Sequence, residues 1–150
     1  MENGNQIYES GDVVILKPLP DGTQIEVTNG SIIAKTGVGK NVTLLQRGSG
    51  EILVSGNCGE GLNVRTDGKF MGGHIGDGAR IDAGGNVLAT TIGKDCTVKS
   101  RRGNITSQST GDNSVLEAGR QIRAGRLGKN VRTLEWAGAR HRESGEGRGR

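Results

Sequence analysis

Short apolar runs alternate with glycine-centred turns along most of the chain. A glycine that follows a mostly apolar residue returns at intervals of 20, 17, 17, 18 and 17 residues. The glycines in question are Gly39, Gly59, Gly76, Gly93, Gly111 and Gly128. A second glycine precedes each of them by eight or nine positions, so each unit predicts a turn, a short strand, a turn and a second short strand. Self-similarity at this period is typical of a solenoid.

The pattern divides the chain into three parts. Residues 1–10 are polar and are expected to be flexible, residues 11–136 are expected to form one solenoid domain, and the Gly- and Arg-rich residues 137–150 a disordered basic tail. Within the domain, the repeats cover residues 30–134, and residues 11–29 precede them as an N-terminal capping strand region.

Apolar residues of the repeats are expected to face a common core. The candidates are Ile32, Val38, Val42, Leu44, Ile52, Val54, Leu62, Val64, Phe70, Ile75, Ile81, Val87, Ala89, Ile92, Val98, Ile105, Val115, Ile122, Leu127, Val131 and Leu134. An open end of such a stack exposes its core, so terminal units are normally capped. The run Val13, Val14, Ile15 and Leu16 is expected to cap one end, and Trp136, where the pattern stops, to cover the other.

Composition supports a narrow core. Of the 150 residues 31% are hydrophobic, with one Phe, one Tyr and one Trp, which is too little to fill a thick globular interior. A stacked coil of short strands needs only small aliphatic side chains. The 28 glycines follow no Gly-X-Y register, so we expect them to serve turns with positive φ. The predicted fold is an all-β, single-domain parallel β-helix with 17–18 residues in each rung.

Two stretches carry a resemblance to known repeats. They are Ile-Gly-Asp-Gly-Ala-Arg-Ile-Asp-Ala-Gly-Gly-Asn-Val at 75–87 and Gly-Lys-Asn-Val at 39–42 and again at 128–131. These resemble the parallel β-helix of bactofilins and of the polymer-forming region of bacterial flagellar assembly protein A. The resemblance implies a right-handed, three-sided coil in a bacterial protein that forms filaments or scaffolds. The basic last unit and tail depart from that pattern and argue against end-to-end polymerisation.

Charge is concentrated at the C-terminus. Residues 1–118 hold 11 Lys and Arg against 13 Asp and Glu, a net charge of −2, whereas residues 119–150 hold 9 against 3, a net charge of +6. Five basic residues recur at intervals of three, namely Arg120, Arg123, Arg126, Lys129 and Arg132. They form a candidate patch for an anionic surface or nucleic acid, although no aromatic residues interleave for base stacking.

Reactive chemistry has little support in the sequence. His74 is a weak catalytic candidate without a partner at a motif spacing, and Gly37–Lys40 lacks the remaining residues of a phosphate loop. Cys58 and Cys96 replace apolar repeat residues and are expected to be buried free thiols. We therefore expect no metal, no cofactor and no small-molecule substrate. Neither a membrane span nor a signal peptide is recognisable, so a cytoplasmic location is expected.

The leading hypothesis is a non-enzymatic scaffold that binds itself or other proteins. One alternative is a trimeric acyltransferase of the left-handed hexapeptide-repeat type, because the steps from Ile75 to Ile81 to Val87 are six residues and His74 lies beside them. Steps of five and seven residues elsewhere in the repeats argue against it. Another alternative is a secreted or host-directed bacterial binding protein.

Overall fold

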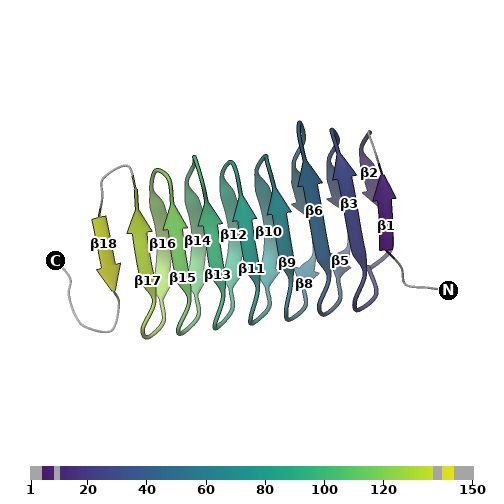
Figure 1. Cartoon of the computed structure of the whole chain (residues 1–150). Coiled ribbons are helices and arrows are strands. Elements are labelled where there is room, and N and C mark those ends of the chain that lie inside the picture. Colours follow the sequence, from purple (N-terminus) through teal and green to yellow (C-terminus); the bar gives the residue numbers. More distant parts are fainter. Residues whose placement is uncertain (1–4, 9–10, 137–139, 144–150) are drawn as a thin grey trace.

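The protein is a stack of parallel coils made only of strands. The structure is a computed structural model that describes residues 5–8, 11–136 and 140–143. All regular elements in these ranges are β-strands, and each coil adds one strand to each of two sheets (Figure 1). One of the two sheets has seven strands hydrogen-bonded in an unbroken row, one from each coil, so the stack has about seven coils. The prediction of an all-β, single-domain parallel solenoid is confirmed.

Sheet A lies nearest the viewer in Figure 1, and sheet B lies behind it. Sheet A is ordered β1 (Asn5–Tyr8), β3 (Gln24–Thr28), β6 (Thr43–Arg47), β9 (Asn63–Thr66), β11 (Arg80–Ala83), β13 (Thr97–Ser100), β15 (Val115–Ala118), β17 (Arg132–Glu135) and β18 (Arg140–Glu143). Sheet B runs through β2 (Val13–Ile15), β4 (Ile32–Ala34), β7 (Ile52–Val54), β10 (Phe70–Ile75), β12 (Val87–Ile92), β14 (Ile105–Thr110) and β16 (Ile122–Leu127), with β5 (Gly37–Val38) and β8 (Asn57–Cys58) beside this path. Neighbouring strands are parallel except β18, which is antiparallel to β17.

The coil is right-handed and bends within sheet B. In Figure 1 the near strands point upward while the chain advances from right to left, which is the sense of a right-handed coil. In β12 the buried residues are Val87, Ala89 and Ile92, so the alternation slips by one position and the strand bends. In the earlier coils the strand breaks at this bend, which separates β4 from β5 and β7 from β8. Each coil therefore has three straight segments.

Close backbone approach explains the recurring glycines. The prediction that they supply positive φ is wrong for the six glycines that recur every 17 to 20 residues. None of these six, Gly39, Gly59, Gly76, Gly93, Gly111 and Gly128, has a positive φ. A Cβ on Gly76 would lie 2.7 Å from the carbonyl carbon of Gly59 in the preceding coil, so no larger residue fits. The positive φ falls two residues later, for example 73° at Gly78 and 61° at Asn113. Glycine, Asn and Asp tolerate this conformation best.

The core matches the expected inward positions except toward the C-terminal end. Most predicted residues are buried in one continuous cluster, with Phe70 among the largest at 0% exposure. Val115 and Leu134 were expected to face inward, and this is wrong, because they align with Arg132 and Glu117 on the outer side of sheet A. Their places in the core are taken by Leu116 (0% exposed) and Thr133 (7%).

The inward orientation predicted for Val115 is wrong because a buried serine, Ser114, precedes the strand where an apolar residue was expected. The corner position before the strand is apolar in most coils, and here it is filled by Ser114, which is 0% exposed. Its hydroxyl donates to the Gly93 carbonyl at 3.0 Å and accepts the Cys96 N–H at 3.2 Å. These bonds satisfy the hydroxyl, so burial costs little, and a search for apolar residues misses the position.

The expected boundaries need two corrections. Residues 11–29 form coils of their own instead of a cap, because β2 pairs with β4 and β3 pairs with β6 in the same way as later strands. Asn5–Tyr8 and Arg140–Glu143, expected to be flexible and disordered, form β1 and β18 at the two edges of sheet A. An exposed sheet edge offers unpaired N–H and C=O groups, which explains why polar segments add to it. The rest of 1–10 and 137–150 lies outside the described residues.

Candidate functional site

The N-terminal end of the stack is open. Inward residues of an interior strand, such as Ile32 and Ala34, are 0% exposed because a coil lies on each side. Val13 and Ile15 occupy the same positions in the first coil, in register with Ile32 and Ala34, yet they are only half-buried. The first coil thus has the inward pattern of the interior, and within residues 5–8, 11–136 and 140–143 no coil lies on its other side.

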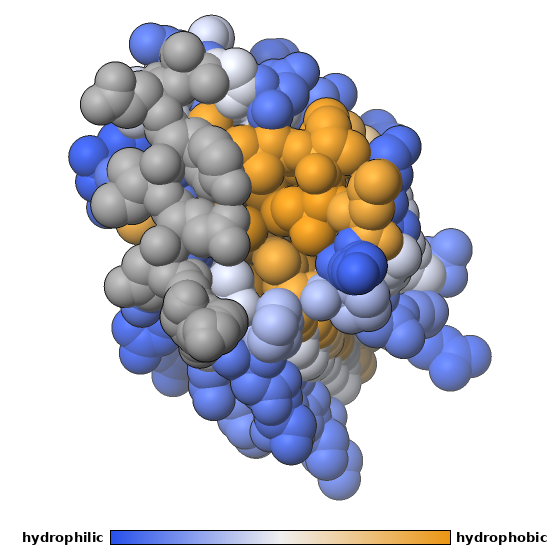
Figure 2. Space-filling model, turned by 90° about the vertical axis from the view of Figure 1, so that its right-hand side faces the viewer, coloured by the Kyte–Doolittle hydropathy of each residue, from blue (hydrophilic) through white to orange (hydrophobic). Residues whose placement is uncertain are grey.

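Apolar side chains gather at this end. Figure 2 looks at the N-terminal end and shows a continuous apolar surface beside the segment drawn in grey. Leu16 is 70% exposed and Val14 51%, the former at the end of β2 and the latter on the outer side of sheet B. The run expected to cap the first rung therefore forms its exposed first layer.

The C-terminal end has a different shape. Sheet A continues through β17 and β18 beyond the last strand of sheet B, β16, so this end is stepped. Ile122 and Ala124 of β16 are half-buried, and Leu127 is 38% exposed. Trp136 is 58% exposed, and its Nε1 donates to Oε2 of Glu117 at 2.6 Å. Because Glu117 lies on the preceding coil, the indole reaches back along the stack instead of covering its end.

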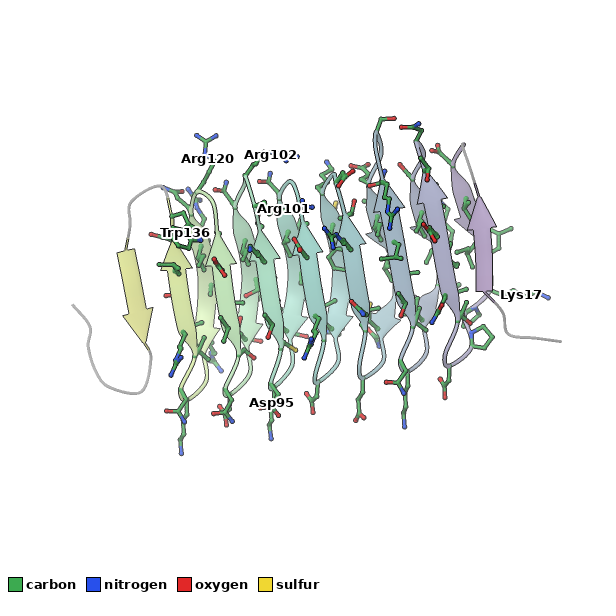
Figure 3. The ribbon with its side chains drawn as sticks, in the orientation of Figure 1. Lys17, Asp95, Arg101, Arg102, Arg120 and Trp136 are labelled. Atoms are coloured by element: carbon green, nitrogen blue, oxygen red, sulfur yellow. The ribbon has the colours of Figure 1, made fainter. Side chains whose placement is uncertain are left out.

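The candidate basic patch is distributed around the last coil. Arg120 lies in the upper turn (Figure 3), and Arg123 and Arg126 lie on the outer side of β16. Lys129 lies in the opposite turn, where its N–H donates to Asp112 Oδ1 at 2.8 Å, and Arg132 lies in β17 of the other sheet. A three-residue step along a 17-residue coil spreads side chains over several sides. Arg123 and Arg126 share the strand β16 but lie on either side of its bend, Arg123 in register with Leu88 and Arg126 in register with Thr91.

Two arginines that the sequence did not single out brace the upper turns. Arg101 donates from Nη2 to the Thr66 carbonyl at 3.0 Å, and its Nε lies 3.1 Å from Asp82 Oδ1. Arg102 donates to the Asp67 carbonyl at 3.1 Å. Both reach across the intervening coil, so they join turns two coils apart and have a structural role. Nothing in the repeat pattern marks these positions.

The weak catalytic candidate has a structural partner. His74 is exposed on β10, and its Nδ1 lies 2.8 Å from the Thr91 hydroxyl in the next coil. The described residues contain no group of three or more His, Cys, Asp and Glu side chains that could hold a metal ion. The right-handed coil also differs from the left-handed coil of hexapeptide transferases, so the structure gives that alternative no support.

Both cysteines are buried free thiols, as predicted. Burial raises the pKa of the Cys58 thiol to about 12 and also raises the pKa of Cys96. A thiol with such a pKa is protonated at neutral pH and is a poor nucleophile or metal ligand.

An apolar ladder on the outer side of sheet B escaped the sequence analysis. One residue of each of five consecutive strands lies in register, and we call this set the outer ladder: Val14, Ile33, Leu53, Met71 and Leu88. Met71 is 38% exposed and Leu88 41%. The signal was present as adjacent apolar pairs, such as Ile32-Ile33 and Val87-Leu88, because two successive strand residues cannot both face the core.

The chain matches no protein-family model, no curated protein and no solved structure. Among the described residues there is no helix with the length and apolar character needed to cross a membrane. The resemblance of the repeats to bactofilins accordingly remains a prediction from their pattern.

Proposed function

We propose that the protein is a non-enzymatic scaffold, a stiff rod that pairs with a second copy through its open N-terminal end. The observation that carries this proposal is the half-exposed inward face of the first coil, where no described coil covers Val13 and Ile15 as neighbouring coils cover the interior ones. The apolar surface at this end is of the kind that marks association sites. The resemblance of the repeats to bactofilins also supports a scaffold.

The shape of the two ends favours pairing at the N-terminus. Sheets A and B both begin in the first coil, with β1 and β2, so this end is level. No described strand pairs with the outer edges of β1 and β2, so these edges can hydrogen-bond with another strand. A two-fold axis through the contact would pair β1 with β1 and β2 with β2 in antiparallel fashion, which gives a closed dimer. The stepped C-terminal end cannot accept a level surface in this way.

The two acidic residues of the first coil that the structure describes do not oppose such a contact. Asp12 Oδ1 accepts the Ser31 N–H at 2.9 Å, and Asp21 Oδ1 accepts the Lys40 N–H at 2.8 Å. Both carboxylates are therefore directed toward the second coil and away from the open end. The core of the contact is apolar, and the charges lie at its rim, as is usual for protein interfaces.

The test uses matched substitutions at the two ends. Ile15 and Ile122 are both half-buried isoleucines on edge strands of sheet B. We expect a dimer by light scattering after size-exclusion chromatography, a monomer for Ile15→Glu and a dimer for Ile122→Glu, each with an unchanged circular dichroism spectrum. A wild-type protein that stays monomeric at all concentrations, or a dimer lost only in Ile122→Glu, contradicts the proposal.

A further inference from the structure

The two sheets carry different charges. None of the nine strands of sheet B, all of them described, contains an aspartate or a glutamate. The strands of sheet A contain Glu26, Asp82, Glu117 and Glu135 among their described side chains, together with basic residues. The outer side of sheet A is thus of mixed charge, whereas the charged side chains in the strands of sheet B are those of Arg123 and Arg126.

Apolar and basic residues follow one line on sheet B. From Leu88 the outer ladder continues in register to Thr106 and then Arg123. Arg126 lies three residues further along the same strand, past the bend and on the neighbouring segment of the coil, in register with Ser109. Neither guanidinium has a hydrogen bond or ion pair with another described residue, and both arginines are exposed. The line therefore begins as five apolar side chains and ends at the exposed Arg123, with Arg126 beside it across the bend of the strand.

One carboxylate lies close to this end, because Glu135 Oε2 accepts the N–H of Ile122, directly before Arg123, at 2.9 Å, without forming an ion pair with Arg123 or Arg126. Two other acidic groups beside sheet B lie farther away. Glu51, in the turn before β7, lies 3.6 Å from Lys69 Nζ, which offsets its charge. Asp12, before β2, accepts the Ser31 N–H. Both lie toward the N-terminal end of the ladder, at least four strands from Arg123. No ion pair with a described carboxylate engages Arg123 or Arg126, so both can bind a further anion.

The dimensions suit a single segment better than a second copy. β4 and β7 are three residues long, so the face that carries the ladder is about 10 Å wide, and six strand spacings from Val14 to Arg123 span about 29 Å. This is about 300 Å², well below the roughly 800 Å² per partner of a stable interface between globular surfaces. An α-helix with its side chains is about 10–12 Å across, and about 19 residues of it cover 29 Å.

We propose that the outer ladder with Arg123 and Arg126 is a docking site for an acidic amphipathic helix of a partner protein. Apolar residues of that helix at spacings of three and four lie on the ladder, since their mean separation of about 5.4 Å per turn is close to the strand spacing of about 4.8 Å. Its carboxylates lie at the end that meets the two arginines, which bind carboxylates in a bidentate manner.

This site does not depend on pairing of the N-terminal ends. It lies on the outer side of sheet B, whereas the proposed dimer contact lies across the end of the stack, and of the ladder only Val14 belongs to the first coil. Each proposal can fail alone, because Ile15→Glu changes none of the five ladder residues and neither arginine.

The experiment measures binding of a designed probe by fluorescence anisotropy. The probe is a labelled synthetic helix with a leucine stripe at spacings of three and four and glutamates in its first two turns; a second probe has lysines in place of the glutamates. We expect the acidic probe to bind the full chain and the basic probe to bind at least about tenfold more weakly, a difference of about 1.4 kcal/mol. We also expect weaker binding at higher salt.

Matched variants locate the site. Met71→Glu and the pair Arg123→Glu with Arg126→Glu should each weaken binding of the acidic probe at least about tenfold. Leu45→Glu, at a half-buried outward leucine of sheet A, and Arg65→Glu, at an exposed arginine of sheet A, should leave it unchanged. Circular dichroism of every variant shows whether the fold is retained.

Three results would overturn the proposal. The first is equal binding of the acidic and basic probes, or equal losses in the variants of the two sheets. The second is co-sedimentation with vesicles rich in phosphatidylserine that Met71→Glu abolishes while the acidic probe fails to bind, which would assign the face to a membrane. The third is a change of oligomeric state in Met71→Glu without probe binding, which would assign it to a second copy.

Discussion

The first coil and the interior coils have the same pattern of inward apolar residues, but these residues are buried only in the interior coils. β2 places Val13 and Ile15 inward as β4 places Ile32 and Ala34, with strand paired to strand in register. The second pair is 0% exposed, and the first is half-buried. In a stack, whether a side chain belongs to the core or to an interface depends only on the presence of a neighbouring coil. The interior residues should therefore control stability, and the first coil should control association.

Thiol reactivity should differ most between the two regions. Because burial raises the pKa of Cys58 to about 12, a far smaller fraction is thiolate at pH 8 than for an ordinary thiol, by about a thousandfold. A Lys17→Cys variant places a thiol at an exposed position of the first coil. We expect it to react with Ellman's reagent within seconds to minutes, while Cys58 and Cys96 react only after unfolding in guanidinium. Rapid reaction of the native wild-type protein would contradict a sealed interior.

Core truncation should cost more in the interior than in the first coil. Ile32→Ala removes a fully buried side chain and should lower the free energy of unfolding by about 2–5 kcal/mol. Ile15→Ala removes a half-buried one and should cost about half as much in the monomer. Urea unfolding followed by circular dichroism at low protein concentration measures both. Equal losses would mean that the first coil is already covered within one chain.

Alanine substitutions at two glycines compare the cost of adding a methyl group between two packed coils, at Gly76, with its cost in the open turn after the first coil, at Gly22. An alanine at Gly76 would press its Cβ against the Gly59 backbone of the adjacent coil, and separating the coils should cost at least about 2 kcal/mol. Gly22 has a φ of 78° and nothing within 4 Å of an added Cβ, so Gly22→Ala should cost only about 1–2 kcal/mol, from the left-handed conformation. Thermal unfolding compares the two variants. A larger loss for Gly22→Ala would show that coil spacing is not tightly held.

Periodicity was sufficient to predict the solenoid, since only a stack repeats every 17 to 20 residues with so few aromatic side chains. It failed where a polar residue fills a core position through hydrogen bonds, as at Ser114, and where the reason for a glycine lies in the adjacent coil, as at Gly76. The candidate site was predicted in part: Val13 and Ile15 were named, but as a cap.

For the basic residues and for the outer ladder alike, spacing along the sequence did not show which side chains lie on the same face. Equal spacing along the chain does not mean a shared face, because a coil turns the direction of its side chains between its strands and turns. Arg120 and Arg132 therefore lie on different sides of the molecule. The ladder residues are 17 to 20 positions apart, and only the strand register brings Leu53 beside Met71.

The most direct test of the central claim is a distance measurement between two copies by electron paramagnetic resonance. Spin labels at Lys17→Cys mark the open end, labels at Lys129→Cys mark the last coil, and the buried native thiols stay unlabelled. Because each stack is about 30–35 Å long, we expect a distance below about 30 Å between the labels at position 17 and one above about 55 Å between those at position 129. A short distance at position 129, or none at position 17, would contradict the account.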